Sequence, residues 1–193
     1  MKKIVASYRV IFPTPAALVT SFDADGRPNV ATAGEVYMLS LRPLVVAVGF
    51  RAATYTNRLI NATGEFTVNL PRKEILSAVD YCGCVSGRQL DKFRATGLTP
   101  LPAKYVKPPI IKECPVNVEC RVQDVIHLPY SDRDVFVGET MAIHVDEEIM
   151  GEDGLPDLRK FTAIAFASNK YYEVTNYLED MRFSIKKDTQ SRP

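Results

Sequence analysis

Alternating and continuous runs of hydrophobic residues divide this chain into several candidate strands. Leu44–Phe50 is apolar throughout, which is typical of a strand buried on both faces. Asn117–Leu128 and Asp134–Val145 alternate between polar and apolar residues, as expected of strands that turn one face toward a core. The other candidates are Ala17–Phe22, Val30–Leu39 and Glu65–Leu70, and one more apolar segment covers Phe161–Ala167.

The connections in the first half of the chain carry turn and helix signals. Asp25-Gly26 is typical of a hairpin turn. Thr54 can cap a short helix that precedes the strand Glu65–Leu70. Tyr55 and Leu59 lie one helical turn apart, so we expect them to form the buried edge of this helix.

The second half contains less regular connections. Cys82–Arg88 has too many glycines for a regular element, and residues 97–116 hold five prolines, which predicts an irregular covering segment. Short helices are expected at Glu74–Val79 and Gln89–Phe93, a polar loop at Glu148–Leu158, and a tyrosine-rich tail from Lys170 onward.

About six strands with only short helices between some of them favour a mostly β protein. We predict a six-stranded antiparallel Greek-key barrel with short helical insertions. A doubly wound sheet is disfavoured because the chain has neither a G-x-G-x-x-G fingerprint nor a G-x-x-x-x-G-K-[ST] loop. With 193 residues, of which 46% are hydrophobic, the chain is expected to form one domain over 1–193, with a core at about 10–175 and a tail at 176–193.

Composition narrows the range of partners. A formal net charge of +1 argues against nucleic-acid binding, which needs a basic surface. No apolar run approaches the ~20 residues that cross a bilayer, and no export signal is evident, so a cytoplasmic protein is expected. The four cysteines form C-x-C and C-x5-C pairs, which lack the C-x2-C spacing typical of zinc or iron–sulfur sites. We therefore expect reduced thiols and no metal.

Two segments point to a bound anionic ligand, and each also has a simpler interpretation. Arg51, Thr54, Thr56 and Asn57 surround a helix start, where unpaired backbone N–H groups favour an anion. Alternatively, Thr54 only caps the helix and Arg51 is a solvated surface charge. The small residues of Ala31–Gly34 would let a ligand approach the backbone closely, or they mark a bulge or barrel corner.

The order of motifs along the chain resembles that of the flavin reductase-like family, also called the FMN-binding split barrel, and within it flavoredoxin-type proteins. The resemblance covers roughly residues 10–175. The matching pieces are Ala17-Leu18-Val19-Thr20, Asp25-Gly26-Arg27-Pro28-Asn29-Val30, Thr54-Tyr55-Thr56-Asn57, Gly64–Leu70, Ser86-Gly87-Arg88, Asp91-Lys92-Phe93 and the strand Gly138–Val145.

This resemblance implies a six-stranded split barrel, a homodimer, and FMN near the subunit interface, with NADH or NADPH as the electron donor. Arg51, Thr54, Thr56 and Asn57 match the segment that receives the FMN phosphate, and Lys92 matches a lysine that adds positive charge there. Asn29 and the backbone of Ala31, Thr32, Ala33 and Gly34 match the strand beside the flavin ring and ribityl chain. His144 matches a polar position near the ring, and Tyr171 matches an aromatic residue that covers the pocket.

One departure from the family pattern concerns Glu35, which stands where flavoredoxin-like sequences commonly have a tryptophan. A carboxylate cannot supply the apolar packing area of an aromatic ring. Three functions are therefore compared: an oxidoreductase that passes electrons from NAD(P)H to flavin or a flavin-coupled acceptor, an electron carrier with tightly bound FMN that a redox protein partner reduces, and a split barrel that has lost flavin. No catalytic acid–base residue is assigned, because flavin carries out this chemistry itself.

Overall fold

The computed structural model describes residues 2–4 and 13–186. Residues 10–12 of the predicted core and residues 187–193 of the predicted tail lie outside the described part. Segment 5–12, which contributed to the expectation that the chain has no export signal, also lies outside it. No helix within the described residues is long and apolar enough to cross a bilayer.

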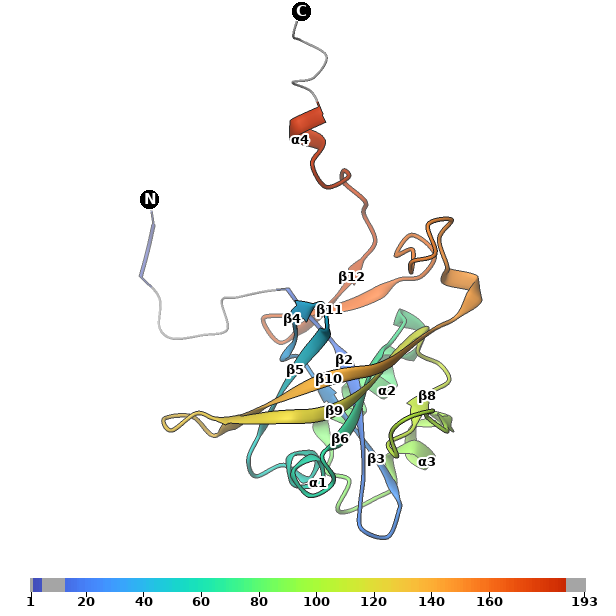
Figure 1. Cartoon of the computed structure of the whole chain (residues 1–193). Coiled ribbons are helices and arrows are strands. Elements are labelled where there is room, and N and C mark those ends of the chain that lie inside the picture. The colour runs from blue at the N-terminus through green and yellow to red at the C-terminus, as the bar shows by residue number, and fades with distance from the viewer. Residues whose placement is uncertain (1, 5–12, 187–193) are drawn as a thin grey trace, which may run out of the picture.

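Seven strands form one antiparallel sheet that makes up the body of the molecule (Figure 1). All their pairings are antiparallel, which confirms the predicted mostly β fold class. In sheet order they are β3 Pro28–Ala33, β2 Ala17–Phe22, β6 Glu65–Leu70, β9 Val116–His127, β10 Arg133–Val145, β5 Leu44–Arg51 and β4 Val36–Leu41.

The predicted single strand Val30–Leu39 is wrong, because the chain bends at Gly34 and Glu35 and continues as two strands. β3 pairs with β2 at one edge of the sheet, and β4 pairs with β5 at the other edge. Because β3 and β4 are consecutive in the chain, the bend between them connects the two edges. The Gly49 N–H of β5 donates to the Glu35 carbonyl at 2.8 Å, which continues the pairing through the bend. Counted as one bent strand, the two halves give the six-stranded barrel that was predicted.

Apolar side chains fill the barrel interior, and helix α1 (Tyr55–Thr63) covers one of its ends (Figure 1). Ile60 of α1 packs in the same buried cluster as Phe66 and Phe136. Thr54 caps α1 as predicted: its side chain accepts from the Asn57 N–H at 3.3 Å. The predicted buried edge is partly wrong, because Leu59 is buried but Tyr55 is only half-buried, and the inward face consists of Thr56, Asn57, Leu59 and Ile60.

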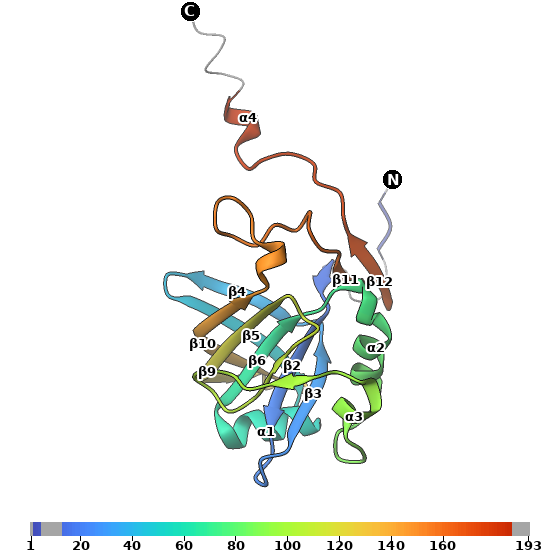
Figure 2. The same ribbon diagram turned by 90° about the vertical axis from the view of Figure 1, so that its right-hand side faces the viewer.

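Two helices cover the outer face of β2 and β3 (Figure 2). Helix α2 (Leu76–Cys84) follows the 3-10 turn η1 (Lys73–Ile75), and α3 (Lys92–Thr96) begins at the capping residue Asp91. The predicted helix Glu74–Val79 was therefore too short, and the expected irregular segment Cys82–Arg88 starts inside α2. Helix formation continues through Gly83 because its missing side chain lets α2 approach Thr32, whose Cβ would lie 3.2 Å from an added Cβ.

Short strands complete the fold. The β11–β12 hairpin was not predicted beyond its apolar first strand, because its turn depends on Ser168 and Asn169 with φ of 51° and 60°. The remaining elements are β1 Thr14–Pro15, β11 Ala163–Ala167 and β12 Lys170–Val174 in one small sheet, β7 Pro100–Leu101 and β8 Ile110–Ile111 in another, the 3-10 turn η2 Glu147–Ile149, and α4 Phe183–Lys186.

A row of buried polar side chains holds the proline-rich segment 98–115 against the barrel. Thr20 and Thr67 both donate to the Pro109 carbonyl, at 2.6 and 3.0 Å. Asn69 accepts from the Ile111 N–H, and Asn117 donates to the Ile111 carbonyl. These bonds satisfy backbone groups that have no strand partner, so an irregular segment can be buried at low cost. We call this row the polar ladder.

Glu119 on β9 extends the polar ladder with a buried charge. Its carboxylate accepts from the backbone N–H groups of Lys104, Tyr105 and Val106 at 2.6 to 3.1 Å, and from His144 Nε2 at 2.6 Å. Burial alone would raise the pKa of Glu119, but the hydrogen bonds from Lys104, His144 and Tyr105 outweigh it and lower the pKa. The carboxylate therefore stabilises the fold in its charged form.

We expect Glu119→Gln to lower the free energy of unfolding by about 3 kcal/mol, because an amide replaces a charged acceptor of several buried N–H groups. Since the folded pKa lies below the usual 4.5, this contribution is present above about pH 4.5 and is lost as the pH falls through the folded pKa. Urea unfolding of wild type and variant at pH 7 and pH 3 measures both effects.

Glu113→Gln is the matched control, because within the described part of the chain the half-buried Glu113 accepts a single backbone bond, from Thr99. A cost below about 1 kcal/mol is expected there. Equal costs for the two variants at pH 7 would contradict the special role of Glu119.

Candidate functional site

Two adjoining cavities lie along β3. The larger has a volume of about 430 Å³ and the smaller about 320 Å³. Three segments contribute to both: β3 and its continuation, the start of α1, and the stretch from the end of α2 to the start of α3. We call the two cavities together the β3 groove, because the shared strand passes from one to the other.

The larger cavity brings together six of the twelve residues that the sequence predicted for a cofactor site: Thr32, Ala33, Gly34, Arg51, Thr54 and Tyr171. Apolar groups from Ala16, Phe50 and Phe166 complete its walls. Phe166 also contacts Tyr171, with ring centroids 5.3 Å apart and planes tilted by 59°. This end of the groove therefore offers a partly apolar surface, to which strands and helix α2 both contribute.

Paired charges border the larger cavity. Arg133 Nη1 lies 3.2 Å from Glu35 Oε2, and Arg51 Nε lies 2.6 Å from Asp132 Oδ2. Two further lining residues are joined by a hydrogen bond, since the Tyr171 hydroxyl donates to Asp80 at 3.0 Å. Burial, together with Asp80, raises the pKa of Tyr171 to about 12, so this hydroxyl keeps its proton. Each cation at this end already has an acidic neighbour.

The smaller cavity contains two further predicted residues, Asn29 and Lys92. The Asn29 amide donates to Ser21 Oγ and to Thr56 Oγ1, at 3.2 and 3.0 Å. Gly87 packs directly on it, since an added Cβ would lie 2.0 Å from Asn29 Oδ1. The loop before α3 therefore needs glycine to reach β3.

Lys92 is the most unusual group in the smaller cavity. It is 5% exposed, and its Nζ donates to the Cys82 carbonyl at 2.7 Å, the one hydrogen bond that the described residues provide for it. Burial lowers the pKa of Lys92, which reflects the cost of placing a charge there. An ammonium has three donors, so two remain to be satisfied. A buried ammonium with spare donors suits an anionic ligand.

Two arginines add positive charge to the smaller cavity. The Arg88 guanidinium lies 5.7 Å from the centroid of the Tyr55 ring and has no carboxylate partner among the described residues. Arg27 pairs with Asp23 and Asp25 at 3.0 and 2.8 Å. Arg88 and Lys92 are therefore the two cations of the groove whose charge is not balanced by a neighbouring acid.

The structure places four predicted residues outside both cavities. Thr56 is buried and accepts from Asn29, and Asn57 is buried and donates to Asp134 Oδ2 at 2.8 Å. Ala31 packs against the barrel interior. His144 pairs with Glu119 in the polar ladder. Thr56 supports the groove through Asn29, whereas His144 is committed to a structural contact.

Several residues that line the groove were not predicted, although some of them belong to sequence motifs that had been recognised. Arg88 belongs to the Ser86-Gly87-Arg88 motif, so it could have been included. Arg133 pairs in register with Arg51 across β10 and β5, which no local pattern reveals. Other residues that line the groove and were not predicted include Tyr55, Asp80, Gly83, Cys84, Gly87 and Phe166.

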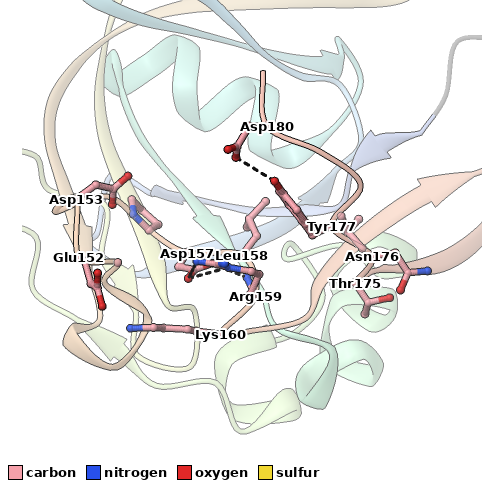
Figure 3. A pocket seen from close by; sticks show the side chains of 13 residues that line it. Glu152, Asp153, Asp157, Leu158, Arg159, Lys160, Thr175, Asn176, Tyr177 and Asp180 are labelled. Carbon is pink, nitrogen blue, oxygen red and sulfur yellow. Dashed lines mark hydrogen bonds and ion pairs between the residues drawn. The ribbon is translucent and has the colours of Figure 1, made fainter. Parts of the chain in front are cut away.

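A third hollow, with a volume of about 850 Å³, lies between residues 151–160 and the segment after β12 (Figure 3). Two side-chain contacts lie within it: Arg159 pairs with Asp157 at 2.8 Å, and the Tyr177 hydroxyl donates to Asp180 at 3.0 Å (Figure 3). It contains none of the residues predicted for a cofactor site. We therefore take the β3 groove as the candidate site.

The cysteines do not form a metal centre in the part of the chain that the structure describes, where no three His, Cys, Asp or Glu residues gather. All four thiols are free, and Cys84, which lines the larger cavity, is the exposed one. Burial raises the pKa of Cys82 to about 11 and that of Cys120 to about 12, so these two are protonated at neutral pH.

Comparisons with known proteins agree with this fold. Residues 8–174 match the model of the flavin reductase like domain. The flavoredoxin of Desulfovibrio vulgaris (Miyazaki F) superposes with a TM-score of 0.89 at 37% identity, over 96% of this chain and all of that one. The flavoredoxin of Methanosarcina acetivorans gives 0.85 at 30% identity, over 97% and 99%. An uncharacterized protein of Archaeoglobus fulgidus is 36% identical over 81% of this chain and 85% of its own length.

Proposed function

Because the chain belongs to the flavin reductase-like family, we propose that it is an FMN-binding oxidoreductase that passes electrons from NADH or NADPH to flavin or to a flavin-coupled acceptor. The observation that carries this proposal is the β3 groove, which has a partly apolar end with aromatic side chains and an end with two cations that no described acid pairs with. FMN has a matching division into an aromatic ring and a phosphate.

The smaller cavity fits the phosphate. Lys92 is a buried ammonium with spare donors, and Arg88 has no acidic partner among the described residues. Hydrogen bonds between such cations and a phosphate are among the strongest in proteins. Asn29, oriented by Ser21 and Thr56, lies on the same wall. Thr56 would then contribute by orienting Asn29 rather than by contacting the ligand.

The larger cavity fits the ring. Thr32, Ala33 and Gly34 line this cavity, and Gly34 has no side chain, so a planar group can approach the strand closely. Phe166 and Tyr171 supply aromatic surface to the same cavity. Arg51 and Thr54 also line this cavity, so they form an alternative site for the phosphate. The binding experiment described below distinguishes the two sites.

Bound FMN would supply the hydride and single-electron chemistry, and the protein contributes binding, orientation and electrostatics. The groove contains no histidine, so no His-based acid–base pair is assigned to it. The protein's own part is to anchor the phosphate, hold the ring on β3 and restrict the access of water.

An electron carrier is the second candidate function, supported by the likeness to two proteins named flavoredoxin. In that case FMN is held permanently and another protein reduces it. The two functions use the same groove and differ only in whether NADH or NADPH reduces the bound flavin directly.

We also propose that the protein works as a homodimer. Edge strand β4 exposes Tyr37, Met38, Leu39 and Leu41 by 47% to 70%, although monomeric proteins rarely expose such apolar edges. The chain after β12 extends away from the barrel (Figure 1) and exposes further apolar side chains at Tyr177, Leu178, Met181, Phe183 and Ile185. A second copy of the chain would cover these surfaces.

The position of the phosphate can be tested by comparing FMN with riboflavin, which lacks it. Arg88→Met should weaken FMN binding by at least tenfold, about 1.4 kcal/mol, and change riboflavin binding less than twofold. Fluorescence titration of the apoprotein measures both. Arg94→Met, an exposed change on α3 outside the groove, is the control. If Arg51→Met rather than Arg88→Met removes the preference for FMN, the phosphate lies at the other end.

Direct reduction by nicotinamide nucleotides separates the two candidate functions. Anaerobic mixing of the FMN-loaded protein with NADH or NADPH should bleach the flavin absorbance rapidly if the protein is a reductase. Dithionite is the control that shows the flavin can be reduced. Bleaching by dithionite but by neither nucleotide would replace the enzyme with the carrier, and failure to bind FMN would exclude both.

Dimer formation through β4 predicts a mass near twice 21.5 kDa in light scattering after gel filtration. Met38→Glu should produce monomers, because a charge would have to be buried in the apolar contact. Ile126→Glu, a comparably exposed change on β9, should leave the dimer intact. A monomeric wild type, or equal effects of the two variants, would contradict this interface.

A further inference from the structure

We propose that Glu35 and Arg133 set the reduction potential of the flavin in opposite directions, Glu35 holding it down and Arg133 holding it up. This proposal rests on the proposed FMN site and concerns the larger cavity, where the ring fits. It assigns a function to the residue that departs from the family pattern.

The backbone holds Glu35 at a fixed place on the cavity wall. Its carbonyl accepts from the Gly49 N–H at 2.8 Å, and β5 approaches so closely that a Cβ on Gly49 would lie 2.9 Å from the Glu35 Cβ. From there the carboxylate reaches Arg133 Nη1 at 3.2 Å. Both side chains line the larger cavity. The pair therefore presents two opposite charges to whatever occupies it.

The other charges around the larger cavity are less well placed to act on the ring. The side chains of Arg51 and Asp132 are 62% and 59% exposed, whereas those of Arg133 and Glu35 are 29% and 27% exposed. Asp132 does not line the cavity, and Asp80 is held by the Tyr171 hydroxyl. Charges that are less exposed are screened less by water and salt, so they act more strongly on a nearby ligand.

Charge near the ring nitrogens is one means by which a protein tunes a flavin. Full reduction adds two electrons and one proton to FMN, so the ring gains one negative charge. A neighbouring carboxylate raises the free energy of that reduced form, and a guanidinium lowers it. Together the two side chains are neutral, so the reduced flavin is not trapped by Arg133 and can pass its electrons on.

A purely structural ion pair, joining the bend of β3 and β4 to the start of β10, would behave differently. Removing either charge would then change the stability of the protein and leave the potential unchanged. The two roles are therefore separated by measuring the potential and the unfolding of the same variants.

The experiment is a dye-mediated spectroelectrochemical titration of FMN-loaded wild type, Glu35→Gln, Arg133→Met and the double variant, with chemical unfolding of each. Glu35→Gln should favour the reduced flavin at least tenfold, a rise of about 30 mV for two electrons. Arg133→Met should favour the oxidised flavin by a similar factor. The double variant should return to within about threefold of wild type, since it restores neutrality.

Asp132→Asn is the matched control, because it frees an arginine at the same mouth without changing the cavity wall, and less than a threefold effect is expected. An unchanged or lowered potential in Glu35→Gln, or an equal rise in Asp132→Asn, would overturn the proposal. If Arg133→Met does not fold, Glu35→Ala replaces it and must shift the potential in the same direction as Glu35→Gln. Absence of FMN binding in wild type would instead defeat the proposed function.

Discussion

The bend at Gly34 and Glu35 is the constraint on which both the barrel and its groove depend. It lets one stretch of chain pair with β2 at one edge of the sheet and with β5 at the other, so the sheet closes. The same bend brings Glu35 so close to β5 that residue 49 has to be glycine, and Gly34 beside it leaves the strand open to a planar ligand. Closing the barrel and exposing a binding surface are therefore two results of one local geometry.

Much of the fold could be predicted from the sequence because its signals are local. Strand alternation, the Thr54 cap and the hairpin at Asp25-Gly26 each depend on neighbouring residues, and all three were recovered. The errors arose where the local structure depends on contacts with residues far away in the sequence or on unusual backbone angles. The helix through Gly83 exists because α2 can pack on Thr32, and the β11–β12 turn depends on backbone angles at Ser168 and Asn169.

The site could be predicted only in part, for the same reason. A motif identifies which residues are near a ligand, but it does not tell which way each side chain faces. Thr56 and Asn57 lie beside the cap residue Thr54, yet both turn inward and bind other side chains. Arg133 enters the groove through strand register, which links it to Arg51 from 82 positions away. Such contacts require the assembled sheet.

The polar ladder has a consequence for how the molecule can open. Its hydrogen bonds come from side chains of the barrel, and segment 98–115 ends before β9 begins at Val116, so this segment can detach without breaking any strand pairing within the main sheet. The covering segment and the barrel can then behave as separate cooperative units, the cover opening at a lower free energy. Its length and sequence can also diverge among related chains while the barrel, and the groove along β3, keep their geometry.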